Sequence, residues 1–448
     1  MNNPKNSTSP DPMTRRDFLK TTSTAAVGAS VLGGLAVDRS AYAAAGDTLK
    51  IALVGCGGRG TGAASQALSV KENVQLVAMA DAFRDRLDGS HNELMRQADL
   101  KKRINVSDDN KFVGFDAYKQ AIALADVVIL ATPPGFRPIH FEEAVRQGKH
   151  VFTEKPVAVD APGVRRFLAA AEEAKKKNLK VGVGLQRHHQ LGYLETIKRL
   201  HDGAIGDITS MRAYWNDAGV WVRPRQPSQT EMEYQMRNWY YFVWLGGDHI
   251  VEQHIHNLDV INWIKKGHPV RGQGQGGREV RKGIDNGQIF DHHFVEFEYA
   301  DGSRLLSQCR HIGGCWSQVA ENVVGTKGTC EVNRYIIRGE GGNWRHNGRD
   351  DKNPYQVEHD DFFQAILDDK PYNEGEYGAI SSMTSIFGRM CTYSGKMLEW
   401  DDAIKSDIDL SPKAYAFDAR PPIVPDANGR YPVAVPGKDI HWWTSDQV

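Results

Sequence analysis

The chain has 448 residues, of which 55 are Lys or Arg and 56 are Asp or Glu, so its formal net charge is −1. This balance provides no positive field that would attract a nucleic acid or an anionic membrane, and we expect neither as a partner. Hydrophobic residues make up 40% and charged residues 25%, which is typical of a soluble globular chain long enough for two domains.

Residues 14–34 read TRRDFLKTTSTAAVGASVLGG and follow the order of an export signal. Arg15 and Arg16 precede a weakly apolar run, and Ala41 and Ala43 frame a small-x-small cleavage site. The run is too weakly apolar for a stable membrane anchor. An ordinary disordered basic N-terminus is the alternative. The stretch resembles a twin-arginine signal, which implies a signal peptide over residues 1–45, the twin-arginine export machinery as a partner, and a folded protein that is periplasmic or otherwise exported.

The five cysteines are scattered and odd in number, so they predict neither a disulfide framework nor a CxxC metal pair. One bridge, between Cys309 and Cys315, stays open. The full set is Cys56, Cys309, Cys315, Cys330 and Cys391.

A glycine-rich loop follows the first apolar run after the signal. Residues 49–54 predict a buried strand that leads directly into GCGGRG, in which Gly55, Gly57 and Gly60 fit the spacing G-x-G-x-x-G. The first glycine permits a tight turn, the second lets the backbone approach a pyrophosphate, and the third lets helix and strand pack closely. We therefore expect a dinucleotide on this loop, with Gly58 and Arg59 among its contacts.

An acidic residue ends the next predicted strand. The run VQLVAMA leads to Asp81, 26 residues after Gly55, close to the spacing of the carboxylate that accepts hydrogen bonds from the ribose. An aspartate at this point favours NAD over NADP because it would repel a 2′-phosphate, although Arg84 is near enough in the sequence to weaken the preference.

Strands and helices then alternate, which predicts a parallel, doubly wound sheet. Ligands bind such sheets at the carboxyl ends of the strands. Thr132 and Pro133 lie in the proline loop that ends the strand predicted over residues 126–134, and Glu154 and Lys155 lie at the end of the strand that begins at His150. We expect all four at the dinucleotide, in a nucleotide-binding domain over residues 46–180.

The second half, residues 181–448, predicts an α/β domain with a mostly antiparallel sheet. Residues 271–287 are rich in glycine and are expected to form an exposed loop, and the proline-rich tail from Ser411 is expected to wrap the surface. Strands are predicted over residues 208–214, 294–299, 304–309 and 317–324, and helices over residues 193–201, 357–367 and 378–398.

The stretch GGDHIVEQHIHNLD predicts a helix from about Ile250 with Glu252, His256 and Asp259 on one face. A carboxylate one turn from an imidazole would orient it and raise its basicity, so that His256 could take a hydroxyl proton. A purely structural contact between the two is the alternative. A metal held by His249, Glu252 and His256 is a further alternative, but no zinc-binding motif is present and we predict no metal site.

Other histidines and tryptophans leave their roles open. The pairs at residues 188–189 and 292–293 are expected in strands or loops rather than as ligands, because neighbouring residues on a strand point to opposite faces. Aromatic faces can line a sugar-like ligand site, but core packing or an interface fits equally well. The tryptophans in question are Trp215, Trp221, Trp239 and Trp244.

The glycine loop, ATPP, GKHVFTEKP, GGDHIVEQHIHNLD and HDDFFQAILDDKP occur in the order seen in the Gfo/Idh/MocA oxidoreductases, which this chain resembles after residue 45. The resemblance implies a Rossmann domain followed by an α/β domain whose open sheet makes a homo-oligomer interface. It implies that Lys155 contacts substrate and nicotinamide, that His256 is catalytic, and that Glu252 stands where relatives often carry aspartate. Arg187 and Asp259 are expected to join Lys155 and His256 as substrate contacts.

We therefore expect an exported, NAD(P)-dependent oxidoreductase that acts on CH–OH groups. It would transfer a hydride between a tightly bound dinucleotide, NAD rather than NADP, and a hydroxyl of a sugar, sugar derivative or cyclitol. Two alternatives remain open: a redox-neutral glycoside hydrolase or lyase that oxidises the sugar transiently, and a non-catalytic sugar- or cofactor-binding protein.

Overall fold

A computed structural model describes residues 48–438 of the chain. The predicted signal peptide over residues 1–45 lies outside the described residues. Within residues 48–438, no helix is both long enough and apolar enough to cross a membrane.

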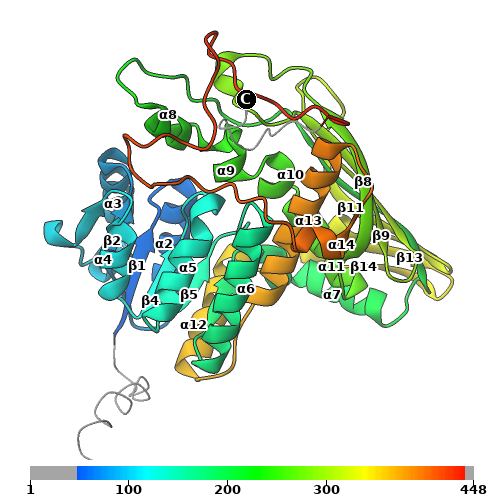
Figure 1. Ribbon diagram of the computed structural model, residues 1–448. Helices are drawn as coiled ribbons and strands as arrows, with labels where there is room; N and C mark the ends of the chain where they lie inside the picture. The colour runs from blue at the N-terminus through cyan, green and yellow to red at the C-terminus, as the bar shows by residue number, and fades with distance from the viewer. Residues whose placement is uncertain (1–47, 439–448) are drawn as a thin grey trace, which may run out of the picture. The chain divides into compact units, whose positions relative to one another are not determined.

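The first sheet is parallel and has six strands in the order β3-β2-β1-β4-β5-β6 (Figure 1). The strand order reverses at β1, which pairs with β2 on one side and β4 on the other, so a crevice is expected at their carboxyl ends. The strands are β1 (Leu49–Val54), β2 (Val74–Asp81), β3 (Lys111–Val113), β4 (Val127–Leu130), β5 (His150–Thr153) and β6 (Val181–Val183).

Side chains alternate across β1 and belong to two cores. Ile51 and Leu53 lie in one apolar cluster with α2, α3 and α12, whereas Ala52 and Val54 lie in another with α4, α5 and α6. Helices therefore cover both faces, as a doubly wound parallel sheet requires. These helices are α2 (Gly58–Leu68), α3 (Arg84–Arg96), α4 (Ala117–Ala123), α5 (Arg137–Arg146), α6 (Ala161–Lys176) and α12 (Pro354–Leu367).

The second sheet has nine strands in the order β14-β13-β12-β11-β7-β10-β9-β8-β15. It is mostly antiparallel, with β7 and β10 as a parallel pair, so the predicted α/β fold is confirmed. Its strands are β7 (Ile208–Asp217), β8 (Pro269–Gly277), β9 (His292–Tyr299), β10 (Arg304–His311), β11 (Gln318–Gly325), β12 (Gly328–Glu331), β13 (Ile336–Gly339), β14 (Gly342–Arg345) and β15 (Leu398–Glu399).

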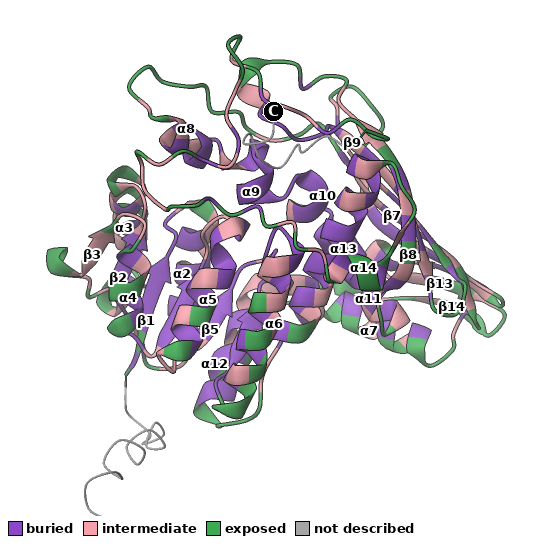
Figure 2. Ribbon diagram, viewed as in Figure 1, coloured by how far each residue is buried: buried purple, intermediate pink, exposed green. Residues whose placement is uncertain are grey.

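Helices pack on one face of this sheet. The long helix α13 is buried along most of its length and packs against β8 and β9 on one side and α6 on the other (Figure 2). The helices of this part are α7 (Leu191–His201), α8 (Glu231–Arg237), α9 (Val243–Gly246), α10 (His249–Glu252), α11 (Ile255–Lys265), α13 (Gly375–Ser394) and α14 (Trp400–Ile404).

The loop expected over residues 271–287 is a wrong prediction for its first half, which belongs to strand β8. Gly272, Gly274 and Gly276 alternate along the strand and lie on the face toward α13. A Cβ atom on Gly274 would lie 2.7 Å from the Phe294 carbonyl oxygen and 2.9 Å from Thr392 of α13. The glycines are there because the helix packs close to the strand, not because the backbone turns.

The tail beyond α14 runs over the surface as expected, in the absence of any helix or strand within residues 405–438 (red in Figure 1). It is anchored at both halves of the molecule: the amide of Leu410 donates to Asp160, and the Tyr431 hydroxyl donates to Glu231 of α8. All five cysteines are free, and Cys309 is buried while Cys315 is exposed, so the open possibility of a bridge between them is wrong.

Candidate active site

A cleft of about 530 Å³ lies at the carboxyl ends of β1, β2, β4 and β5, where the first domain meets α8, α10 and α11. Its wall includes every residue that the sequence predicts at the dinucleotide: Gly55, Gly57, Gly58, Arg59, Gly60, Asp81, Thr132, Pro133, Glu154 and Lys155. Glu252 and His256 line the same cleft.

The glycine loop has the geometry that its spacing predicts. Gly55 has a φ of +97°, and a Cβ atom on Gly60 would lie 1.9 Å from the Gly55 carbonyl oxygen, so only glycine fits at these two positions. A Cβ atom on Gly57 would meet nothing within 4 Å, so its open side is free for a ligand. Helix α2 begins at Gly58, and its first amides face a site suited to the pyrophosphate of NAD.

Asp81 is held rigidly at the end of β2. Its carboxylate oxygens accept hydrogen bonds from the amides of Cys56 (2.7 Å) and Phe83 (2.9 Å), which leaves further lone pairs for ribose hydroxyls. Burial raises its pKa above the usual range, while these two amides oppose the rise. Arg84, which stands near enough to Asp81 in the sequence to weaken the predicted preference for NAD, lies 3.7 Å from Asp88, whereas Arg86 lines the cleft.

Arg59 joins the glycine loop to the strand end that carries Lys155. Its Nε donates to Glu154 (2.5 Å), and its guanidinium lies 5.0 Å from the ring centroid of Tyr355, which lies in the first turn of α12 and also lines the cleft. Tyr355 could not be predicted as a cleft residue, because nothing in the sequence relates a helix near residue 355 to a loop near residue 59.

Lys155 and Glu252 form the polar pair at the other end of the cleft. Lys155 Nζ donates to the Glu252 backbone carbonyl (2.6 Å) and lies 3.3 Å from the carboxylate. The predicted contact between Glu252 and His256 is wrong because the helix is broken: α10 ends at Glu252 and α11 begins at Ile255. Glu252 therefore positions the lysine rather than the histidine.

His256 lies in the cleft with its side chain almost buried. It is 8% exposed, its Nδ1 has no hydrogen-bond partner among the described residues, and its ring stacks on Trp215 at 5.9 Å. Burial, together with the charges of Lys155 and Arg187, lowers the pKa of His256 well below its usual value. The imidazole is therefore neutral and available as a proton acceptor, but the raised basicity expected from the sequence is wrong, because the charges around it are positive.

Two predicted substrate contacts do not reach the cleft. Asp259 is 2% exposed and bonds to His188 (2.9 Å) and Ser381 (2.8 Å) behind α11. Arg187 forms a buried ion pair with Glu321 and donates to the backbone carbonyl of His256 (2.9 Å). Arg187 thus supports the catalytic segment from behind, and the expectation of direct substrate contact for both residues is corrected.

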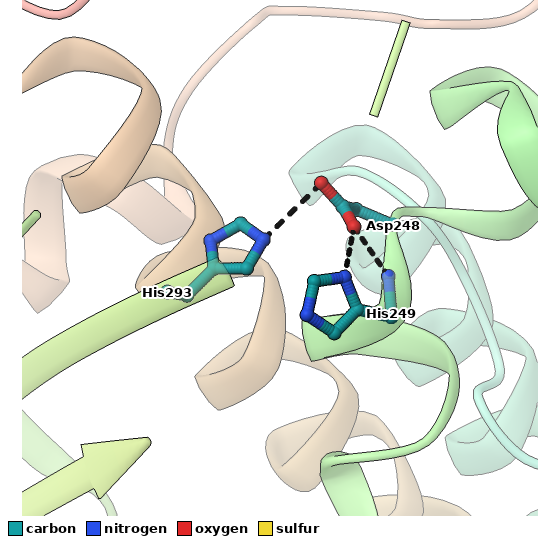
Figure 3. A group of neighbouring side chains, drawn as sticks. All are labelled: Asp248, His249 and His293. Carbon is teal, nitrogen blue, oxygen red and sulfur yellow. Dashed lines mark hydrogen bonds and ion pairs between the residues drawn. The ribbon is translucent and has the colours of Figure 1, made fainter. Parts of the chain in front are cut away.

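The alternative of a metal held by His249, Glu252 and His256 on one helix is wrong, because the helix is broken between Glu252 and Ile255. His249 also points away from the cleft and toward Asp248. Asp248, His249 and His293 do place ligand-type atoms within 4.8 Å of one another (Figure 3). However, Asp248 already accepts from His249 Nδ1 (2.7 Å) and the Tyr393 hydroxyl (2.5 Å), and the Arg281 guanidinium lies 3.5 Å from His249. This buried network fixes the start of α10, and its donors and positive neighbour disfavour a cation.

The tryptophans divide between the cleft and the core. Trp221 and Trp239 line the cleft, Trp215 lies behind His256, and Trp244 is 3% exposed in the core.

The comparisons with known proteins agree with this geometry. Residues 49–184 match the family described as the oxidoreductase family with an NAD-binding Rossmann fold, and residues 193–331 match the GFO/IDH/MocA C-terminal domain. The chain is 26% identical over 285 residues to inositol 2-dehydrogenase of Rhizobium meliloti, covering 63% of this chain and 74% of that protein. It is 26% identical over 213 residues to a glycosyl hydrolase family 109 protein of Solibacter usitatus, covering 46% of each.

A solved structure has the same fold. Scyllo-inositol dehydrogenase from Lactobacillus casei, with bound NAD(H) and scyllo-inositol, superposes with a TM-score of 0.59 at 20% identity, over 79% of this chain and 100% of that one. The glycine loop, the two matching domains and this shared architecture lead to one conclusion: the chain belongs to the Gfo/Idh/MocA family and is an NAD-dependent oxidoreductase.

Proposed function

We propose that the protein oxidises a CH–OH group of a sugar, sugar derivative or cyclitol in the cleft between its two domains. The observation that carries this proposal is that the Lys155–Glu252 pair and a neutral His256, which bonds to no side chain within residues 48–438, lie in the cleft that holds the glycine loop. NAD, when bound, supplies the acceptor for the hydride.

The residues of the cleft have separate tasks in this proposal. His256 accepts the hydroxyl proton through Nε2, because Nδ1 is enclosed by protein. Lys155, held in place by the carbonyl and carboxylate of Glu252, donates a hydrogen bond to the same hydroxyl and stabilises the charge that develops on oxygen. Arg187 holds the backbone of His256 and so keeps the imidazole in position.

We further propose that the cofactor is retained between turnovers. Arg237 of α8 donates two hydrogen bonds to Asp85 (2.7 and 2.8 Å) and lies over the ring of Phe83 at 3.8 Å. Phe417 of the tail packs on Phe83 (5.5 Å) and Phe115 (5.0 Å), both of which line the cleft. Helix α8 and the C-terminal tail therefore both contact the end of the cleft near Asp81. These contacts favour slow release of the dinucleotide.

Retention fits the proposal that the protein is exported through a twin-arginine signal in residues 1–45. Free NAD is not expected outside the cytoplasm, so an exported enzyme would fold around its cofactor first and regenerate it in place. Regeneration could proceed by ping-pong, in which one sugar is oxidised and a second reduced.

A second candidate is the redox-neutral glycoside hydrolase or lyase, in which oxidation acidifies a neighbouring C–H, the glycosidic bond breaks, and the ring is reduced again. Trp221 and Trp239 in the cleft wall favour it, since aromatic faces can stack on the sugar rings of a glycoside. The similarity to the glycosyl hydrolase family 109 protein points the same way. A sugar- or cofactor-binding protein without catalysis is the third possibility. The presence of Lys155 and His256 in the cleft argues against it, because these are the groups that the reaction requires.

The test uses mature protein purified from the exported fraction without added nucleotide. The protein is denatured, the released dinucleotide is quantified and identified by mass, and the intact protein is assayed with sugar pairs and glycosides. About one NAD per chain and steady turnover without added NAD would support the proposal. Strict dependence on added NAD would refute retention, and unchanged turnover in both Lys155→Met and His256→Asn would refute the assigned site.

We also propose that the protein is a homo-oligomer through the face of the second sheet opposite α11 and α13. Side chains of β9 and β10 alternate between buried and more exposed, and the more exposed face carries Phe294 and Leu306 among polar and charged residues. Light scattering tests this directly: a mass of a single chain at micromolar concentration would contradict it.

A further inference from the structure

Trp221 is an exposed aromatic residue inside the candidate active site. Its side chain is 40% exposed, yet it lines the same cleft as Lys155, Glu252 and His256. Large exposed aromatic surfaces in a cleft mark binding sites more often than chance surface positions do. Nothing in the proposed proton and hydride transfer requires this side chain.

The ring of Trp221 is held in a fixed orientation. The edge of Trp239 packs on it at 5.9 Å and an interplanar angle of 67°, and Tyr240 packs at 6.2 Å and 66°. The guanidinium of Arg223 lies 5.2 Å from the ring centroid. A rigid aromatic surface loses little conformational entropy when a ligand stacks on it, so this arrangement is preorganised for binding.

The platform is connected to the catalytic end of the cleft. The Tyr240 hydroxyl donates to the side chain of Gln253 (2.7 Å), which directly follows Glu252 in the sequence. The ring of Tyr240 therefore connects Trp221 to the break between α10 and α11. Glu252, the partner of Lys155, precedes this break and His256 follows it. A ring bound at His256 would leave Trp221 available to a second group on the same substrate.

The chemistry of the platform fits a pyranose ring. A pyranose has an apolar C–H face that can stack on an indole and a rim of hydroxyls that accept hydrogen bonds. Arg223 offers guanidinium donors beside the indole, and its guanidinium forms no ion pair with a carboxylate within residues 48–438. A negatively charged group would use only the guanidinium of Arg223, and a purely apolar group would use only the indole face of Trp221.

We propose that Trp221, with Arg223, Trp239 and Tyr240, forms a second sugar subsite, so that the substrate is a glycoside of at least two rings. One ring is oxidised at His256 and the second stacks on Trp221. This inference rests on the proposed function and narrows its substrate class: single-ring sugars and cyclitols fill only the catalytic position.

The test compares disaccharides (cellobiose, lactose and maltose) with methyl glucoside and methyl galactoside, on protein with bound NAD. The second-order rate constant for reduction of the bound NAD is measured for the wild type, Trp221→Ala, Trp221→Phe and Val222→Ala. Val222 is the matched control because it is also 40% exposed, adjoins Trp221 and does not line the cleft.

We expect Trp221→Ala to lower the rate constant for disaccharides about tenfold, the effect of one aromatic stacking contact. Methyl glycosides and Val222→Ala should stay within about twofold of the wild type. Trp221→Phe should recover part of the loss, and the NAD content per chain should not change. An equal loss for both sugar classes, no loss, or a lower NAD content would overturn the subsite.

Failure of the proposed function gives a different result. If the wild type reduces its bound NAD with neither class of sugar, the proposed oxidation is wrong, and calorimetric titration of the three disaccharides then decides the subsite alone. Weaker disaccharide binding by Trp221→Ala than by Val222→Ala would support it. Equal binding by the two variants, or no binding to the wild type, would overturn it.

Discussion

The glycines of residues 55–60 lie at the cleft, where they surround a turn, whereas those of residues 272–277 lie in β8, near one edge of the second sheet and beneath a helix. Position 55 requires glycine because its φ is positive. Position 60 requires glycine because a Cβ atom there would lie 1.9 Å from the Gly55 carbonyl oxygen. Gly274 has an ordinary extended backbone and instead makes room for α13. Both segments are glycine-rich, but the first forms a ligand site and the second allows close packing.

Spacing distinguishes the two segments better than composition does. The pattern G-x-G-x-x-G places glycines around a strand-to-helix turn. The pattern G-x-G-x-G repeats every second residue, which is the period of one face of a strand. Read with this period, residues 272–276 predict a strand covered by a helix rather than a loop.

Gly60→Ala should have the largest effect, because the new Cβ would collide with backbone rather than with a flexible side chain. The loop must shift, so we expect NAD affinity to fall by about 100-fold and the free energy of unfolding to fall by about 2 kcal/mol. Nucleotide titration and urea denaturation measure the two effects. Normal NAD affinity in this variant would mean that the loop does not hold the cofactor.

Gly274→Val should separate packing from binding. The side chain would press against Phe294 and Thr392, and we expect the free energy of unfolding to fall by about 1–3 kcal/mol while NAD affinity stays unchanged. Gly277→Ala is the control on the same strand, since its Cβ would meet only the His292 ring at 3.5 Å. Similar stability of the two variants would contradict the packing explanation.

Gly57→Ala should have the opposite effect to Gly274→Val, because it should weaken NAD binding and leave the stability unchanged. Its Cβ would meet no atom of the described residues within 4 Å, so the nucleotide-free protein should keep its stability to within about 0.5 kcal/mol. A methyl group here would nevertheless obstruct the pyrophosphate, and we expect the Kd for NAD to rise about tenfold. An unchanged Kd would place the pyrophosphate elsewhere.

The smallest expected effect concerns pH. Because the pKa of His256 lies well below 6.5, the imidazole stays unprotonated as the pH falls through 6.5. The rate constant for NAD reduction should therefore hold between pH 7.5 and about 5.5, with no loss centred on the ordinary histidine pKa. A drop centred near pH 6.5 that disappears in His256→Asn would show that the base titrates normally.

The sequence predicted the first domain well because its signals are local. The residues from Gly55 to Gly60 and Asp81 are specified by short spacings, and the carboxyl ends of parallel strands bring Thr132 and Lys155 to them. The second domain was harder, because β8 depends on a helix more than 100 residues later and the start of α10 depends on a network that includes Tyr393.

The candidate site shows the same limit. Lys155, Glu252 and His256 were predicted, but helical periodicity assigned Glu252 to the histidine, whereas the helix breaks at Gln253 and the lysine 97 residues earlier takes the carboxylate. Helical spacing likewise placed Asp259 at the cleft, although it bonds behind α11. The hydrogen-bond partners of Glu252 and Asp259 are determined by tertiary packing, which cannot be predicted from a local sequence pattern.

The central claim is that this cleft passes a hydride from a sugar hydroxyl to bound NAD with His256 as the base. The most direct measurement loads the protein with NAD, adds cellobiose or methyl glucoside, and follows the near-ultraviolet absorbance of reduced nicotinamide in the wild type and in His256→Asn. The account predicts reduction of up to about one NAD per chain in the wild type and at least about 100-fold slower reduction in the variant. Equal rates in the two proteins, or no reduction by any sugar or cyclitol tested while NAD is bound, would contradict it.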